Sequence, residues 1–268
     1  MGKLKLGAML RLGTFEASYL QTLQDIGMRE SQLCRVSEKY LRGQEGLQNS
    51  EELIRSLQQK ELPPTSIFVA APGGVIEPKC RCQNMLNICR QLNWAERHGI
   101  KVAVCHVGEL PENKGPEFEQ FIADLQQLAR LAEENQQQFL FETGSIDGDT
   151  LLEIFTAADS PALGLNLDPG NVLIYNLPES PLELYQKLSP WVKALHCKDA
   201  KRPQSGEERG RESVLGEGDS EFAALFQTIL RDGFRGPIVI EREIPIGPEQ
   251  FKDLKNALGL LQKLAEHN

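Results

Sequence analysis

Four short apolar runs in this chain each end in one acidic residue or one histidine: Phe139-Leu140-Phe141-Glu142, Gly164-Leu165-Asn166-Leu167-Asp168, Val192-Lys193-Ala194-Leu195-His196 and Ile238-Val239-Ile240-Glu241. A loop and then an amphipathic helical stretch follow each run. This order is typical of a parallel α/β barrel, in which the carboxyl ends of all strands meet on one face. The four terminal polar residues are therefore expected to converge, although they lie far apart in the sequence.

Three carboxylates and one imidazole at the mouth of a barrel suit a divalent cation, because such ions prefer carboxylate oxygens and imidazole nitrogens as ligands. Each residue alone has a simpler explanation. A carboxylate at a strand end often caps the next helix, and a single histidine is more often packed than metal-binding. Four such residues at equivalent positions favour the metal site, with these ligands: Glu142, Asp168, His196 and Glu241.

Strand-like runs alternate with helix-like stretches along the whole sequence, with no linker between them. The predicted strands are Leu4–Leu10, Ser31–Val36, Ser66–Ala70, Lys101–His106, Gln138–Glu142, Leu163–Asp168, Val192–His196 and Pro237–Glu241. A (β/α)8 barrel takes about 250 residues, so we expect residues 1–268 to form a single (β/α)8 TIM-barrel domain. The alternative is an open doubly wound sheet. That fold would place a glycine-rich phosphate turn after the first strand, and Leu10-Arg11-Leu12-Gly13-Thr14 does not supply one.

Several helix starts are visible in the sequence. Ser50 precedes an acidic and apolar stretch, and Gly115-Pro116 and Gly247-Pro248 each place a proline at a first helical turn. Ser180-Pro181-Leu182-Glu183 has the spacing of a capping box, in which the serine and the glutamate satisfy free backbone N–H groups reciprocally. These signals predict helices that begin at the four positions.

The composition is that of a globular protein, with 40% hydrophobic and 25% charged residues. A formal net charge of −9 argues against a nucleic-acid partner, which would favour a basic face. No apolar stretch approaches the roughly 20 residues that span a membrane, and residues 1–7 contain no apolar signal segment, so we expect a cytoplasmic protein without a membrane partner. The cysteines include no CxxC pair, and Cys34, Cys105 and Cys197 are predicted to be reduced core residues.

Five short motifs follow one another at the predicted strand ends: Glu142-Thr143-Gly144, Asp168-Pro169-Gly170-Asn171, His196-Cys197-Lys198-Asp199, Gly216-Glu217-Gly218 and Glu241. In this order they resemble the sugar phosphate isomerase/epimerase family of the xylose-isomerase-like TIM-barrel superfamily, over essentially the whole chain. That family includes ketose 3-epimerases, hydroxypyruvate isomerases and inosose dehydratases. The resemblance implies that the four strand-end residues bind one Mn²⁺, Mg²⁺ or Co²⁺ ion. It also implies that Arg202 contacts the substrate.

The chemistry of such a reaction agrees with these residues. To isomerise or epimerise a sugar beside its carbonyl, an enzyme removes a proton from carbon, and a bound cation stabilises the resulting enediolate. A base must lie on the face where the proton leaves, and an acid where it returns. Glu142 and Glu241 are expected to flank the substrate from two sides of the barrel mouth and to act as catalytic bases as well as ligands.

Further residues are predicted to line the substrate pocket. His106 ends the fourth predicted strand, and Lys198 is expected either to meet an anionic substrate group or to pair with Asp199. Asn171 stands where ketose epimerases have a histidine that polarises the substrate, and an amide donates hydrogen bonds but transfers no proton. The polar loop that begins at Arg202 is either a cover over the site or a solvated surface segment.

The sequence therefore predicts a metal-dependent isomerase or epimerase acting on a small sugar-like molecule, with its oligomeric state left open. The alternative on the same scaffold is a dehydratase of an inosose or dehydroshikimate-like substrate, which also starts with proton removal. A hydrolase of the endonuclease IV type needs a three-metal cluster, for which four histidines in the chain are too few. A non-catalytic sugar-binding barrel is the remaining alternative.

Overall fold

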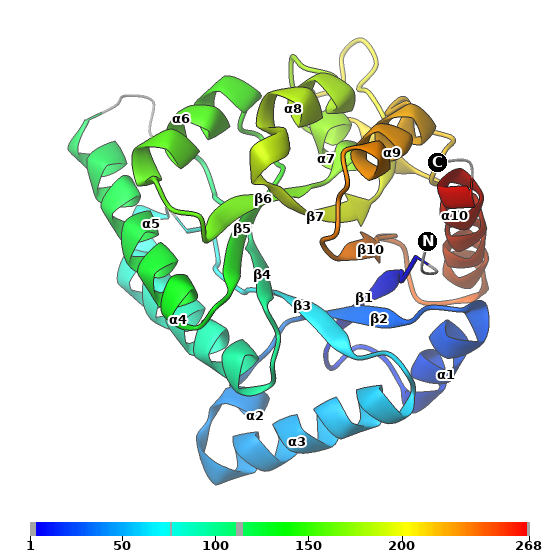
Figure 1. Cartoon of the computed structure of the whole chain (residues 1–268), viewed down its shortest axis with the longest axis horizontal. Helices are drawn as coiled ribbons and strands as arrows, with labels where there is room; N and C mark the ends of the chain where they lie inside the picture. Colours follow the sequence, from blue (N-terminus) through cyan, green and yellow to red (C-terminus); the bar gives the residue numbers. More distant parts are fainter. Residues whose placement is uncertain (1–3, 76, 111–114, 267–268) are drawn as a thin grey trace.

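The computed structural model describes residues 4–75, 77–110 and 115–266. Eight parallel strands are hydrogen-bonded into a closed barrel in the order β1-β10-β7-β6-β5-β4-β3-β2, which Figure 1 shows as a ring with the helices outside it. The barrel strands are β1 Gly7–Arg11, β2 Glu30–Cys34, β3 Pro64–Phe68, β4 Val102–Cys105, β5 Gln138–Glu142, β6 Leu163–Leu167, β7 Val192–Cys197 and β10 Ile238–Ile240. The predicted (β/α)8 fold is confirmed, because a closed parallel ring excludes an open sheet.

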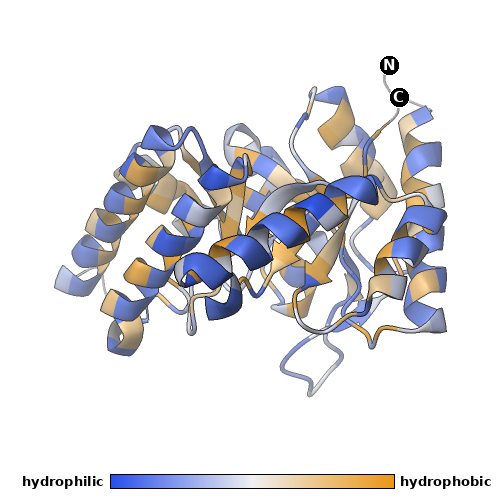
Figure 2. Cartoon of the chain, turned by 90° about the horizontal axis from the view of Figure 1, so that it is seen from below, coloured by the Kyte–Doolittle hydropathy of each residue, from blue (hydrophilic) through white to orange (hydrophobic). Residues whose placement is uncertain are grey.

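Helices cover the outside of the barrel, and each of them except the four-residue helix Glu38–Leu41 has buried side chains. They are α1 Ala17–Ile26, α2 Glu38–Leu41, α3 Gly43–Gln59, α4 Arg81–Arg97, α5 Pro116–Glu134, α6 Gly148–Ala158, α7 Pro169–Ile174, α8 Pro181–Leu188, α9 Phe222–Arg231 and α10 Pro248–Glu266, with short 3-10 turns at Pro78–Cys80 and Ser189–Trp191. Figure 2 shows hydrophobic strands at the centre and hydrophilic outer faces on the surrounding helices. Within the described residues, no helix combines the length and apolarity needed to cross a membrane.

Three of the four predicted helix starts are confirmed. Helices α5 and α10 begin at Pro116 and Pro248, and α8 begins behind a complete capping box formed by Ser180 and Glu183. The start expected at Ser50 is wrong, because α3 already begins at Gly43. The Ser50 hydroxyl instead donates to a backbone carbonyl one turn earlier, which lets serine lie inside a helix.

Strands β2 and β3 begin and end one or two residues earlier than the sequence predicts. Arg35 has a φ of 62°, in the left-handed region that ends an extended strand, so β2 stops at Cys34 rather than at Val36. Pro64 opens β3, which is a position where the missing N–H of proline disturbs no ladder.

A two-stranded antiparallel hairpin follows β7 and was not predicted. It pairs β8, Asp199–Lys201, with β9, Arg211–Ser213. The Asp199 carboxylate holds the next loop by accepting hydrogen bonds from the backbone N–H groups of Gly216 and Gly218, both at 3.0 Å. A Cβ at Gly218 would lie 1.9 Å from an oxygen of Asp199, so this close approach requires glycine. The hairpin begins at Asp199, directly beyond the end of β7.

Candidate functional site

A cavity of about 580 Å³ opens at the carboxyl ends of the barrel strands. It is lined by residues from several strands and strand-end loops, including Met9, Arg11, Cys34, Arg35, Phe68, His106, Glu142, Asn171, Tyr175, Lys198, Glu241 and Glu243. Active sites of (β/α)8 enzymes lie at this face because the loops that carry functional side chains meet there. This cavity is the candidate active site.

The four predicted metal ligands converge beside this cavity, where Glu142 and Glu241 line it and Asp168 and His196 are fully buried. Glu142 is the last residue of β5, His196 lies in β7, and Asp168 and Glu241 directly follow β6 and β10. All four side chains are buried, and one ligand atom from each lies within 4.8 Å of the others. A single ion at about 2.0–2.4 Å from each donor can be reached by atoms with this spread. The arrangement that the strand ends predicted is thus present in the structure.

His196 lies at the centre of the cluster. Its Nδ1 atom is 2.7 Å from Oε1 of Glu142, 3.0 Å from Oε2 of Glu241 and 3.8 Å from Oδ2 of Asp168. Three buried atoms that face this point are close enough for ion pairs but make no well-directed hydrogen bond with any described residue: His196 Nδ1, Asp168 Oδ2 and Glu241 Oε2. Buried polar atoms without well-directed hydrogen bonds are costly, and these are the donor types that a divalent cation accepts. The residues present therefore fit a metal ion.

The charges of the cluster are strongly coupled. Burial disfavours a charged imidazole, but the carboxylates of Glu241 and Glu142 outweigh it and raise the pKa of His196 to about 10. Burial raises the pKa of Asp168 to about 8, although Lys198 acts in the opposite direction. Burial also disfavours the charge on Glu241, but His196 and Lys198 lower its pKa to about 2. Without an ion, protons on His196 and Asp168 offset the crowded negative charge.

Neighbouring groups orient two of the ligands. The Asp168 oxygen Oδ1 accepts the backbone N–H of Asn171 at 2.9 Å and caps α7, which leaves Oδ2 to face the centre of the cluster. The carboxylate thus serves as helix cap and candidate ligand at once. On the other side, Nε2 of His196 lies 2.9 Å from Oε1 of Gln32, so Nδ1 is the nitrogen that points at the carboxylates. Such outer contacts fix the direction of metal ligands.

Lys198 and Asn171 both line the cavity, as the sequence predicts for substrate-binding residues. Lys198 is only 3% exposed, and its Nζ donates to Glu243 at 2.7 Å and to the Asn171 side-chain oxygen at 3.3 Å. The expected alternative pairing with Asp199 is not made, because Asp199 binds backbone N–H groups instead. Burial opposes the charge on Lys198, but the surrounding carboxylates raise its pKa well above the usual range. It is therefore a fixed cation beside the cluster.

His106 also lines the cavity. Its Nδ1 atom is 3.2 Å from Oε2 of Glu142, on the side of that carboxylate away from His196, and its ring is 54% exposed. The ring packs edge-on against Phe68, with 5.0 Å between centroids. His106 is thus placed to exchange a proton with Glu142 or with a molecule in the cavity.

Arg202 is not brought to the cavity. Its guanidinium donates to Oδ1 of Asn176 and to the backbone oxygens of Leu177 and Glu179, at 2.9–3.2 Å. Later in the same loop, the guanidinium of Arg209 lies 4.8 Å from the ring centroid of Tyr175, a residue that lines the cavity. In this structure Arg202 supports the loop before α8, and its predicted contact with substrate stays a prediction.

Three residues of the site did not stand out in the sequence. Gln32 lies inside β2, and only the closed barrel brings it against His196. Arg11 directly follows the predicted first strand, so the rule that identified Glu142 would also have identified it. Glu243 lies two residues beyond Glu241, and the sequence gives no signal for its contacts with Arg11 and Lys198.

Comparisons with solved structures and curated proteins find several similar proteins. A xylose isomerase domain protein from Planctomyces limnophilus has a TM-score of 0.89 and 27% identity, over 99% of this chain and 98% of that one. A D-tagatose 3-epimerase-like protein has a TM-score of 0.76 and 18% identity, over 98% and 97% of the two chains, which shows the shared fold. An inosose dehydratase from Lacticaseibacillus casei is 24% identical over 149 residues, or 50% of this chain and 49% of the relative.

The chain thus spans about half the length of the curated relatives it matches. A broader match comes from a family model, that of the xylose isomerase-like TIM barrel, which covers residues 20–264. This range includes every strand of the barrel except β1, and all four residues of the candidate metal cluster. Together with the closed barrel and its strand-end site, the match shows that the chain belongs to the xylose isomerase-like TIM barrel family.

Proposed function

We propose that this protein is a divalent-metal-dependent isomerase or epimerase that removes a proton next to the carbonyl of a small sugar-like molecule. The observation that carries the proposal is the buried cluster beside the cavity, whose donor atoms lie close together without well-directed hydrogen bonds. Its ligands would be the four residues Glu142, Asp168, His196 and Glu241. When bound, a divalent cation supplies stabilisation of negative charge on the oxygens of the substrate.

Glu142 and Glu241 are the proposed bases. Each lines the cavity, and their strands lie three places apart around the ring of eight. Oε1 of Glu142 faces His196, while Oε2 faces the exposed ring of His106, so one oxygen can serve as ligand and the other can accept a proton. Two carboxylates that reach the cavity from different strands suit proton removal on one face and return on the other.

A dehydratase is the second candidate, and two observations favour it. Nδ1 of His106 lies 3.2 Å from Oε2 of Glu142, so an imidazole beside the proposed base is in place to pass a proton to a departing hydroxyl. The curated relative with 24% identity is an inosose dehydratase. In the dehydratase reaction, Glu142 removes the proton and His106 assists the loss of water. Lys198 is a poor proton donor because its pKa is raised, so it is assigned to orientation of the substrate.

Mass spectrometry of the products separates the two candidates. The purified protein is incubated with ketoses, hydroxypyruvate and inososes, with added Mn²⁺ or Mg²⁺ and in parallel with a chelator. An isomerase or epimerase gives a metal-dependent product of unchanged mass, whereas a dehydratase gives a product that has lost one water. Turnover that is unaffected by complete metal removal would contradict both.

A further inference from the structure

One carboxylate inside the cavity is held between two cations. Oε1 of Glu243 accepts a hydrogen bond from Nη2 of Arg11, and Oε2 accepts one from Nζ of Lys198, both at 2.7 Å. The two cations thus hold one carboxylate by its two separate oxygens. Such two-point binding is the usual way in which proteins recognise carboxylate and phosphate groups.

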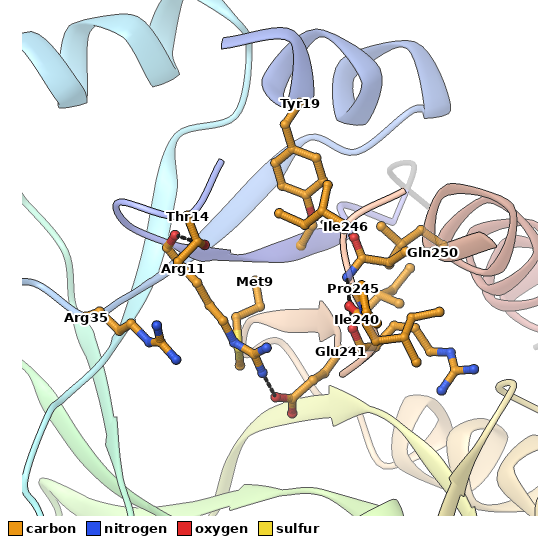
Figure 3. A pocket seen from close by; sticks show the side chains of 14 residues that line it. Met9, Arg11, Thr14, Tyr19, Arg35, Ile240, Glu241, Pro245, Ile246 and Gln250 are labelled. Atoms are coloured by element: carbon orange, nitrogen blue, oxygen red, sulfur yellow. Dashed lines mark hydrogen bonds and ion pairs between the residues drawn. The ribbon is translucent and has the colours of Figure 1, made fainter. Parts of the chain in front are cut away.

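The two cations do not depend on Glu243 for their positions. Lys198 is also held by the side-chain oxygen of Asn171 and lies 3.7–3.8 Å from oxygens of Asp168 and Glu241. Arg11 is the last residue of β1 and lies 4.0 Å from Glu241, a contact drawn in Figure 3. Both cations would therefore remain in place if the side chain of Glu243 moved away.

Glu243 has the freedom to move. Its side chain is 44% exposed, in contrast to the buried ligand two residues before it. Its backbone N–H donates to the Glu212 carboxylate at 3.0 Å and 3.2 Å, which anchors the main chain of this loop. Rotation of the side chain would break only the contacts with Arg11 and Lys198. A competing anion would replace those contacts with equivalent ones.

A third cation faces the same place without a partner. Arg35 lines the cavity and also the adjoining pocket of about 280 Å³, and it makes no hydrogen bond or ion pair with any residue that the structure describes. Figure 3 shows its guanidinium on the same side of Glu241 as that of Arg11. Because the protein has a net charge of −9, its composition alone does not predict three cations together at the barrel mouth.

We propose that Arg11, Arg35 and Lys198 form a subsite for an anionic group of the substrate, a carboxylate or a phosphate, and that Glu243 occupies this subsite until the substrate displaces it. The inference rests on the proposed function for the reacting end of the substrate. It adds that the substrate carries a negative charge away from the reacting carbon, and that Glu243 competes with weakly bound anions for this subsite.

The proposed anion subsite is tested by measuring the binding of matched probes by calorimetry, in the presence of Mn²⁺. Fructose 6-phosphate is compared with fructose, and dehydroshikimate with a neutral inosose, so that the two pairs distinguish a phosphate from a carboxylate. Glu243→Gln keeps the shape and removes the competing charge. If Glu243 fills the subsite about nine-tenths of the time, its removal lowers the Kd of the anionic probe about tenfold and leaves the neutral probe unchanged. Arg35→Gln raises the Kd of the same anionic probe.

Glu109→Gln is the matched control, because Glu109 is an exposed acid after β4 that is absent from the described lining of the cavity. If Glu109→Gln tightens anion binding as much as Glu243→Gln, the effect is general electrostatics and the proposal is wrong. It is also wrong if Glu243→Gln weakens anion binding or if no anionic probe binds. The proposed function fails separately: selective anion binding without proton exchange on any substrate would refute the reaction and leave the subsite standing.

Discussion

Nε2 of His196 lies 2.9 Å from Oε1 of Gln32, a residue of β2 that precedes it by 164 positions in the chain. The Gln32 amide nitrogen donates to the hydroxyl of Ser66 in β3 at 3.1 Å, which leaves its oxygen to accept the proton on His196 Nε2. The contact therefore fixes Nδ1 as the nitrogen available to a metal ion. A residue from a distant strand thus orients the central residue of the candidate metal cluster.

Gln32→Leu should weaken metal binding by about 10- to 100-fold, because the histidine loses the partner that sets its direction. A competition titration against a metal-sensitive dye measures the change. Gln137→Leu is the control, since Gln137 is also a buried glutamine but bonds to backbone oxygens away from the cluster. Equal metal affinity in the parent and in Gln32→Leu would contradict the orienting role.

Metal affinity should depend steeply on pH. The pKa of His196 is raised to about 10 and that of Asp168 to about 8, so both bind a proton at neutral pH in the metal-free protein. An ion must displace these protons, and its affinity should therefore rise with pH, by about one to two log units per pH unit near pH 7. Calorimetry in buffers of different ionisation enthalpy counts the released protons. If metal binding at pH 7 releases no proton, His196 and Asp168 do not hold the protons that this prediction requires.

Arg202→Lys separates support of the loop from contact with substrate. Lysine cannot reproduce the fork of N–H groups that binds the side-chain oxygen of Asn176 and the backbone oxygens of Leu177 and Glu179. We expect unfolding to become easier by about 1–3 kcal/mol, because these acceptors lose a charged donor. Thermal unfolding and steady-state kinetics are measured together. A raised KM with unchanged Tm would instead support the substrate contact that the sequence predicts.

Much of the fold follows from local patterns that sequence displays directly. Every barrel strand overlaps a predicted strand, because buried parallel strands are largely continuous apolar segments. Strand β2 ends before the predicted residue because Arg35 has a positive φ, and the presence of an arginine gives no sign of that conformation. The β8–β9 hairpin was missed because three-residue polar strands have no recognisable period.

The site was predictable only as far as it lies at strand ends. Glu142, Asp168, His196 and Glu241 share one structural position on four strands, so a single rule located all of them. The contacts of Gln32 and Glu243 are set by the closure of the barrel and by side-chain direction, which no local pattern encodes. The contacts of Arg202 could not be predicted for the same reason, because its guanidinium binds backbone oxygens of a loop that is distant in sequence.

In the proposed reaction, Glu142 and Glu241 of the candidate metal cluster exchange a carbon-bound proton of the substrate. The most direct test is NMR detection of deuterium incorporation from heavy water at the carbon next to the carbonyl, with Mn²⁺ present, for the parent, Glu142→Gln and Glu241→Gln. Glutamine keeps an oxygen but cannot act as a base. We predict incorporation by the parent and a fall of about 10²–10⁴ in rate in at least one variant. Exchange at the parental rate in both variants would contradict the account.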